Sequence, residues 1–276
     1  MPSRPVALAA GLLALAALPA AAGDLAAVLY ERTLMREAGA RCKLFAPPVQ
    51  AGLAAGAAQA RGAALRAGAD PRALDGAAAR AADRALREPC GSPDLRIAAQ
   101  RVRAAFLGWS RQSVLELPGP GGGWTARRRG ERAAPFWALS TRARIAGAPA
   151  MLGLRRASPG EPAALVLETA APEAARAWTA RLALRDPRRA PQPYLAADGS
   201  PPASALLETP ASGKQALDGG RAWRFTFPDR AADALAALDP REHVRVELVG
   251  PGDRTVSALV EAGDFATGRA FLAAGG

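Results

Sequence analysis

One histidine stands out among the residues of this sequence that could do chemistry. His243 is the single histidine of the chain, and Asp239 and Glu242 lie close to it along the sequence. A histidine oriented by a carboxylate is a common general base. One hypothesis is therefore a hydrolase or transferase that uses His243 as its base. A surface or structural role is favoured, because no obvious nucleophile accompanies His243 in the sequence.

Motifs that would identify an enzyme or a metal site are absent from the sequence. There is no Gly-x-Ser-x-Gly turn for a nucleophilic serine. Ser212-Gly213-Lys214 is similar to the end of a phosphate-binding loop, but Glu208 and Gln215 replace the glycine and the hydroxyl residue that such a loop needs. Zinc and calcium motifs are missing as well. The sequence therefore predicts no catalytic, cofactor-binding or metal-binding residue.

The many arginine side chains are the third group of residues that could have a chemical role. The net charge is +11, and 34 of the 36 basic residues are arginines, the exceptions being Lys43 and Lys214. Positive charge is spread over both halves of the chain, which argues against a nucleic-acid-binding arm. Outside the cytoplasm such a charge favours anionic envelope components, acidic proteins or peripheral contact with anionic lipid.

Three arginines are candidates for anion binding. Arg181, Arg224 and Arg245 each alternate with apolar residues in a predicted strand, so their side chains should point to solvent. If their strands are neighbours, the guanidinium groups form one basic face that holds phosphate or carboxylate groups. The alternative is an ordinary solvated face, balanced by Glu247, Asp186 and Asp229.

Two cysteines, Cys42 and Cys90, are the only ones in the chain. An even pair in an exported protein predicts a disulfide. A crosslink over this sequence separation stabilises the fold by about 4 kcal/mol in the chain-entropy model. Two buried free thiols are the alternative.

The first residues look like a signal peptide. Arg4 precedes an apolar run over residues 6–18, which ends in small residues at 20–22. We expect cleavage after Ala22, giving a periplasmic protein with a signal peptide at 1–22. An uncleaved anchor is less favoured, because the run is shorter than the ~20 apolar residues that span a bilayer.

Apolar periodicity divides the rest of the chain in two. Residues 23–116 follow a helical period, with helices expected near 24–42, 49–67, 71–88 and 92–109. Residues 117–123, rich in proline and glycine, are predicted to be a linker. Residues 124–276 follow a period of two, clearest at 178–184, 223–227 and 244–248, and two short helices are expected after Pro228 and Gly263. Aromatic side chains are expected in the core of this part, Trp178 among them, whereas Trp109 is a candidate for packing between the halves.

The predicted fold class is therefore α+β. A small helical bundle, held by its disulfide, precedes a mainly antiparallel β-sandwich-like domain with two short helices.

Three stretches carry a resemblance to known proteins. Residues 101–109, together with 260–265 and 269–272, resemble uncharacterised exported proteins of alphaproteobacteria that have a helical front and a β-rich back. The C-terminal part is also similar to the invasion-associated locus B family of periplasmic β-proteins, through a strand that ends in glycine and an aromatic residue before a short closing helix. Neither resemblance implies catalytic residues.

The sequence as a whole favours a non-enzymatic periplasmic envelope protein without a cofactor, whose β-rich domain binds an anionic or protein partner. Besides the hydrolase or transferase, an inhibitor or chaperone-like partner of an envelope enzyme is an alternative. That protein would use the proline-rich loops at 187–193 and 200–202.

Overall fold

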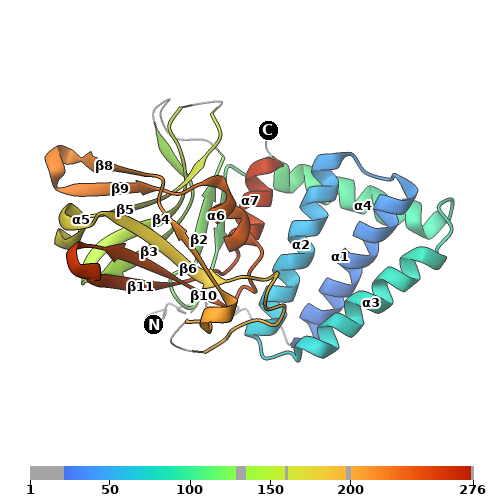
Figure 1. Ribbon diagram of the computed structural model, residues 1–276. Helices are drawn as coiled ribbons and strands as arrows, with labels where there is room; N and C mark the ends of the chain where they lie inside the picture. The colour runs from blue at the N-terminus through green and yellow to red at the C-terminus, as the bar shows by residue number, and fades with distance from the viewer. Residues whose placement is uncertain (1–21, 129–134, 159–160, 197–199, 275–276) are drawn as a thin grey trace, which may run out of the picture.

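The computed structural model describes residues 22–128, 135–158, 161–196 and 200–274. Over these residues the chain is α+β, with a helical half followed by a half built from two antiparallel sheets (Figure 1). The predicted fold class is confirmed.

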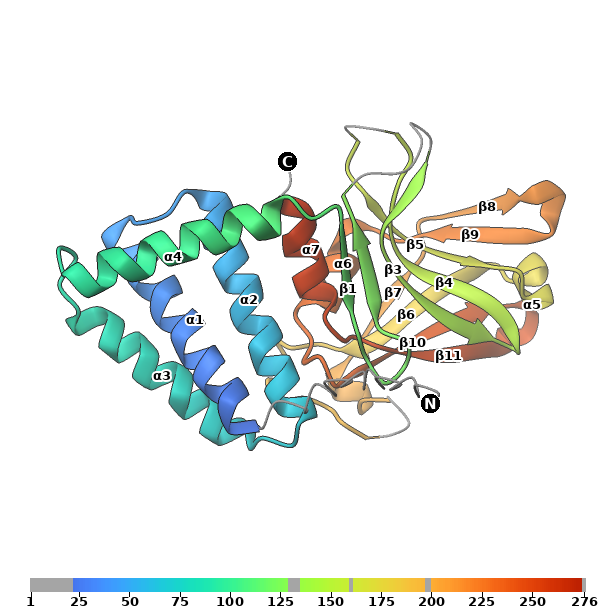
Figure 2. The ribbon, with the colours of Figure 1, turned by 180° about the vertical axis from the view of Figure 1, so that it is seen from behind.

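Four helices make the helical half. They are α1 (Ala22–Cys42), α2 (Pro47–Arg66), α3 (Pro71–Arg87) and α4 (Pro93–Ser110). α1 lies between α2 and α3, and α4 crosses this layer (Figure 1, Figure 2). Alanines such as Ala38, Ala64 and Ala81 are fully buried between the helices. Their small side chains allow the helix axes to approach closely.

Two helix starts follow the rules that predicted them. The Asp70 carboxylate accepts a hydrogen bond from the Arg72 amide at 3.2 Å, and the Ser92 hydroxyl accepts one from the Leu95 amide at 3.2 Å. In both helices proline occupies the first turn, where its missing N–H costs nothing.

The β half consists of a seven-stranded and a four-stranded sheet, and every pair of neighbouring strands is antiparallel. In spatial order the larger sheet contains β1 (Val114–Leu117), β2 (Trp124–Arg127), β3 (Phe136–Ile145), β4 (Ala148–Arg156), β5 (Ala164–Thr169), β9 (Ala222–Thr226) and β8 (Gly213–Leu217). The smaller contains β11 (Thr255–Glu261), β10 (His243–Val249), β6 (Thr179–Arg185) and β7 (Leu206–Pro210).

One apolar core fills the space between the sheets. Leu152 and Leu167 of the larger sheet and Leu182 and Val246 of the smaller belong to one buried cluster, together with Phe225. In β9 and β10 these residues alternate with polar ones, so the period of two marks the inner face there, whereas β4 and β5 contain runs of adjacent buried residues. Trp124 is also in this core, but Trp178 is 64% exposed. The prediction of a core position for Trp178 is wrong, because this residue precedes β6 and lies beyond the end of the packed strands.

Three α-helices accompany the sheets: α5 (Pro172–Arg176), α6 (Asp229–Ala236) and α7 (Phe265–Ala273). The last two are the helices expected after Pro228 and Gly263, whereas α5 was not predicted. Single 3₁₀ turns occur at Ala203–Ala205, Asp218–Gly220 and Pro251–Asp253.

The predicted linker at 117–123 is a hairpin loop inside the larger sheet. β1 precedes it, β2 follows it, and Leu117 pairs with Trp124. The β half therefore begins at Val114, and residues 111–113 connect it to α4. The proline and glycine signal marks a turn correctly, but a turn between two strands and a boundary between two domains look the same in sequence.

Helix α7 joins the two halves. It packs against α2 on one side and against β2 and β3 on the other (Figure 1). The Asp264 side chain, at the start of this helix, makes no capping hydrogen bond and instead accepts one from Arg66 of α2 at 2.8 Å. A methyl group at Gly62 of α2 would lie 2.9 Å from the Pro240 ring. A buried ion pair therefore supports the α2–α7 contact, and α2 also packs closely against the segment before β10.

Candidate functional site

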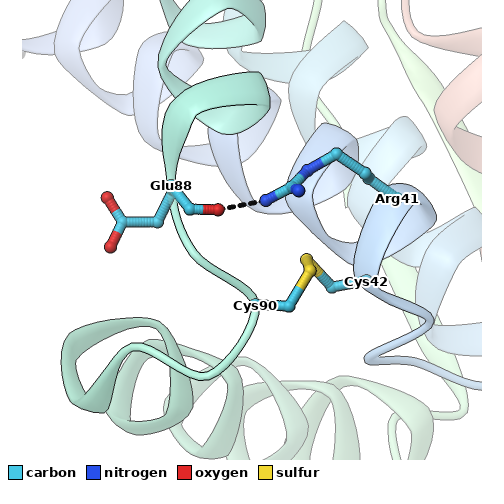
Figure 3. Close-up of a disulfide and its surroundings, with 4 residues drawn as sticks. All are labelled: Arg41, Cys42, Glu88 and Cys90. Carbon is cyan, nitrogen blue, oxygen red and sulfur yellow. Dashed lines mark hydrogen bonds between the residues drawn. A yellow bond between two sulfur atoms is a disulfide. The ribbon is translucent and has the colours of Figure 1, made fainter.

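The predicted disulfide is present. Cys42, at the end of α1, is bonded to Cys90, between α3 and α4 (Figure 3). Beside it, the Arg41 guanidinium donates a hydrogen bond to the Glu88 carbonyl (Figure 3). The crosslink therefore holds three helices of the bundle together at one end, which is a structural role.

The three candidate anion-binding arginines do not form one face. Arg181 and Arg245 lie on neighbouring strands of the smaller sheet, whereas Arg224 lies on β9 of the larger one. The strands of Arg181 and Arg245 are therefore neighbours, as a single basic face would require, but the strand of Arg224 is not next to either of them. Local alternation gives the direction of a side chain within its sheet but not the sheet to which a strand belongs.

Carboxylates face each of these arginines. Nε of Arg181 and Nε of Arg245 each lie 2.6 Å from one of the two carboxylate oxygens of Glu247. The Arg224 guanidinium lies 2.6 Å from Glu168. Glu247, named as a balancing charge from sequence alone, is thus shared by two of the three candidates. This pairing reduces the positive potential that these side chains offer to an external anion.

The most deeply buried ion pair of the β half also involves an arginine. Arg185 donates two hydrogen bonds to the two carboxylate oxygens of Glu242, both at 2.6 Å, and both side chains are almost fully buried. Glu242 further accepts the backbone amides of Tyr194 and Asp239 at 3.2 and 2.8 Å. This network ties the loop after β6 to the start of β10, and it occupies one of the carboxylates considered as a partner of His243.

His243 is the first residue of β10 and pairs with Glu261 across the strands. It lines a small pocket of about 110 Å³ with Trp124 and Thr141. Among the described residues the imidazole makes no side-chain hydrogen bond or ion pair, and Asp239 is bonded to Arg241 at 3.0 Å. The neighbouring carboxylates of the sequence therefore do not orient His243, and its role as a base stays a hypothesis.

A larger pocket lies in the helical half, and sequence reasoning did not find it. It has a volume of about 310 Å³ and lies among α1, α2 and α4, with Thr267 of α7 also lining it. Its walls are mainly apolar, and they include Leu53, Val102 and Phe106. We call it the Arg32 pocket, because Arg32 is the one charged residue among the described residues that line it.

Two glycines of α2 shape this pocket. Gly52 and Gly56 are one turn apart and face it together. A methyl group at Gly52 would lie 3.1 Å from the Phe106 ring, and one at Gly56 would lie 3.4 Å from the Arg32 side chain. The absence of a side chain at Gly52 lets the Phe106 ring approach the α2 backbone closely, whereas a methyl group at Gly56 would only touch the Arg32 side chain.

Arg32 is held by the backbone rather than by a carboxylate. Its Nη1 donates a hydrogen bond to the Gly56 carbonyl at 2.6 Å. Among the described residues this is its one side-chain hydrogen bond, and it forms no ion pair there. Burial lowers the pKa of the Arg32 guanidinium from its ordinary value. Because arginine nevertheless stays protonated in proteins, the pocket contains a positive charge with several unused N–H donors.

Aromatic residues form the end of the pocket nearest the β half. Trp109 lies 5.9 Å from Phe106 and 5.3 Å from Phe271 of α7, measured between ring centroids, so it does pack between the halves as the sequence suggested. The Arg128 guanidinium lies 3.7 Å from the Phe271 ring centroid and donates to the carbonyls of Phe271 and of Ser110. These carbonyls end α7 and α4, so a cation here satisfies two helix C-termini.

In the sequence, the residues that line the Arg32 pocket show no feature that marks them as a site. Arg32 falls among the polar positions of a predicted helix, and only its unpaired state in the fold distinguishes it. A weaker signal was available: glycines at positions 52 and 56 of an alanine-rich helix are spaced for one face, and so are Phe106 and Trp109 of α4. Spacing alone does not indicate that these faces meet around an arginine.

Within the described ranges, no group of three or more His, Cys, Asp and Glu side chains is placed to hold a metal ion. No helix in that part of the chain is long and apolar enough to cross a bilayer. Comparison with protein-family models, with curated proteins and with solved structures finds no match to this chain.

Proposed function

We propose that the protein is a non-enzymatic binding protein of the bacterial envelope, exported to the periplasm, and that it binds an anionic ligand in the Arg32 pocket. The disulfide and the predicted signal peptide support the compartment. The ligand site differs from the one favoured by sequence, because the arginines of the β half are paired with carboxylates.

One observation carries this proposal: Arg32 presents a partly buried positive charge in a mainly apolar pocket without a carboxylate partner among the described residues. A charge-assisted hydrogen bond to an anion contributes about 1.5–3 kcal/mol in such surroundings. The pocket volume of about 310 Å³ also lies at the lower end of the range for small-molecule sites. An anionic small molecule fits both the charge and the size.

The test is a fluorescence titration of the mature chain with 8-anilinonaphthalene-1-sulfonate, an apolar anion. We expect Arg32→Gln to weaken binding at least tenfold, since about 1.4 kcal/mol corresponds to a factor of ten. Arg36→Gln is the matched control, because Arg36 lies one turn further along α1, pairs with Glu37 at 2.5 Å and does not line the pocket. Equal affinities for the wild-type chain and Arg32→Gln would overturn the proposal.

A second pair of variants tests the location independently of charge. Ala105 lines the pocket, whereas its neighbour Ala104 does not, and both are exposed on α4. Tryptophan at position 105 should block the pocket and abolish binding of the probe, and tryptophan at position 104 should leave it unchanged. Binding that survives Ala105→Trp would place the anion elsewhere.

A further inference from the structure

The shape and chemistry of the Arg32 pocket narrow the class of ligand beyond an anion. This inference rests on the proposed function, and it concerns which anion the site selects. A free inorganic anion needs several hydrogen-bond donors around it. Here the charged donor is Arg32 alone, accompanied by the amide of Gln59 and the hydroxyl of Thr267. That set can hold one charged group at one side of the pocket.

Apolar side chains make up most of the remaining wall. Val49 and Leu53 belong to α2, and Val102, Phe106 and Trp109 belong to α4. An inorganic anion or a sugar would leave this surface in contact with water, whereas an alkyl or aryl group would bury it. Burial of each methylene contributes about 0.8 kcal/mol. The pocket therefore combines one binding position for an anionic group with an apolar surface beside it.

The volume limits the size of the apolar part. A pocket of about 310 Å³ has room for about ten water molecules. A two-chain phospholipid is far larger than this, whereas a single chain of medium length fits. The exposed position of Ala105 at the pocket shows that the site opens to solvent there, so a chain longer than the pocket can extend outward.

From this arrangement we infer that the Arg32 pocket selects a single-chain amphipathic acid, such as a medium-chain carboxylate. Its carboxylate contacts the Arg32 guanidinium, and its hydrocarbon part lies between α2 and α4 along Phe106 and Trp109. The Gly56 carbonyl accepts a hydrogen bond from Nη1 and so keeps the guanidinium oriented. The ligand supplies the counter-charge that Arg32 lacks among the described residues.

Calorimetric titration with a homologous series tests this inference. The ligands are acetate, hexanoate, decanoate, decanol and inorganic phosphate, each added to the mature chain at constant ionic strength and below the concentration at which the ligand aggregates. For the carboxylates we expect affinity to rise about fourfold per methylene until the pocket is full. Decanol should bind at least tenfold more weakly than decanoate, and phosphate should bind no better than acetate.

The variants separate this inference from the proposed function. In Arg32→Gln the preference for decanoate over decanol should disappear, whereas Arg36→Gln should keep it. If decanoate and decanol bind the wild-type chain equally, or if phosphate binds better than decanoate, the amphipathic-acid inference is wrong even though the pocket binds ligands. If 8-anilinonaphthalene-1-sulfonate binding is unaffected by Arg32→Gln or by Ala105→Trp, the proposed function itself fails.

Discussion

On the faces of the β-sandwich, arginines such as Arg185 and Arg224 lie against glutamates, whereas Arg32 in the helical half lies against a backbone carbonyl. The side chains are the same, but the electrostatic surroundings differ. An arginine that is neutralised within the fold stabilises contacts between strands or loops. Arg32 meets a carbonyl in an apolar pocket, so no carboxylate among the described residues neutralises its charge. The comparison indicates that the counter-ion, rather than the exposure of the arginine, distinguishes the candidate site.

The largest effect should come from removing a counter-ion in the β half. Glu242→Gln leaves the Arg185 charge buried without its carboxylate, and we expect the free energy of unfolding to fall by about 3–5 kcal/mol. Urea denaturation of the mature chain measures this change. Glu208→Gln is the control, since Glu208 is 40% exposed beside Arg181, and it should cost less than about 1 kcal/mol. Similar losses for both variants would contradict the comparison.

Arg128 should show the next largest effect. Arg128→Met removes the hydrogen bonds to the ends of α4 and α7 and the cation–π contact with Phe271, and we expect a loss of about 2–3 kcal/mol in urea denaturation. Arg127→Met is the neighbour control, because Arg127 is exposed on β2. If the two variants are equally stable, Arg128 does not hold the halves together.

Substitution of Arg32 should leave the stability of the fold unchanged or slightly higher, whereas loss of the carboxylate that pairs with Arg185 should lower it. Arg32→Met removes a desolvated charge that has no carboxylate partner among the described residues, so we expect the free energy of unfolding to be unchanged or to rise by up to about 1 kcal/mol without ligand. The same variant should lose binding of the anionic probe. A loss of stability as large as that of Glu242→Gln would show that the Arg32 charge is structural.

The smallest effect should be a dependence on pH at the α2–α7 contact. Burial raises the pKa of Asp264 from its ordinary value, against the opposing effect of Arg66. Folded Asp264 therefore binds its proton more tightly than unfolded Asp264, and its contribution to stability is largest below the unfolded pKa and is lost as pH rises through the folded one.

Asparagine at position 264 does not titrate, so it provides the comparison. Between pH 3 and pH 7 the stability of Asp264→Asn relative to the wild-type chain should shift in favour of the variant. Both chains are compared at each pH by urea denaturation, because other groups also titrate. A relative stability that does not change with pH would contradict a raised pKa at this position.

Much of this fold can be predicted from local patterns of apolar residues in the sequence, whereas the candidate site cannot. Helical spacing predicts α1 to α4, alternation predicts β6, β9 and β10, and the cysteine pair predicts the disulfide. The helices and strands depend on residues close together in sequence. The disulfide could be predicted because the chain has only two cysteines, which can pair in only one way. The sheet that contains Arg224 depends on contacts between distant strands, which alternation does not encode.

The Arg32 pocket requires still more distant information. It appears only when α1, α2 and α4 are packed together, so that Gly56 meets Arg32 and Gly52 meets Phe106. Trp109 could be predicted between the halves because it ends a helix just before the strands begin. The sequence around Arg32 does not show that it has no carboxylate partner among the described residues, because tertiary packing determines which charged groups lie next to each other.

The position of α7 has a consequence for how the molecule matures. Synthesis from the N-terminus produces α1, α2 and α4 long before α7, and folding generally proceeds in that order. Thr267, a part of the pocket wall, arrives with α7 after both sheets have been delivered. The helical layer can therefore pack early, yet the pocket wall is complete only when the sandwich has folded and its last helix has docked. Under the proposed function, ligand binding requires both halves to be assembled.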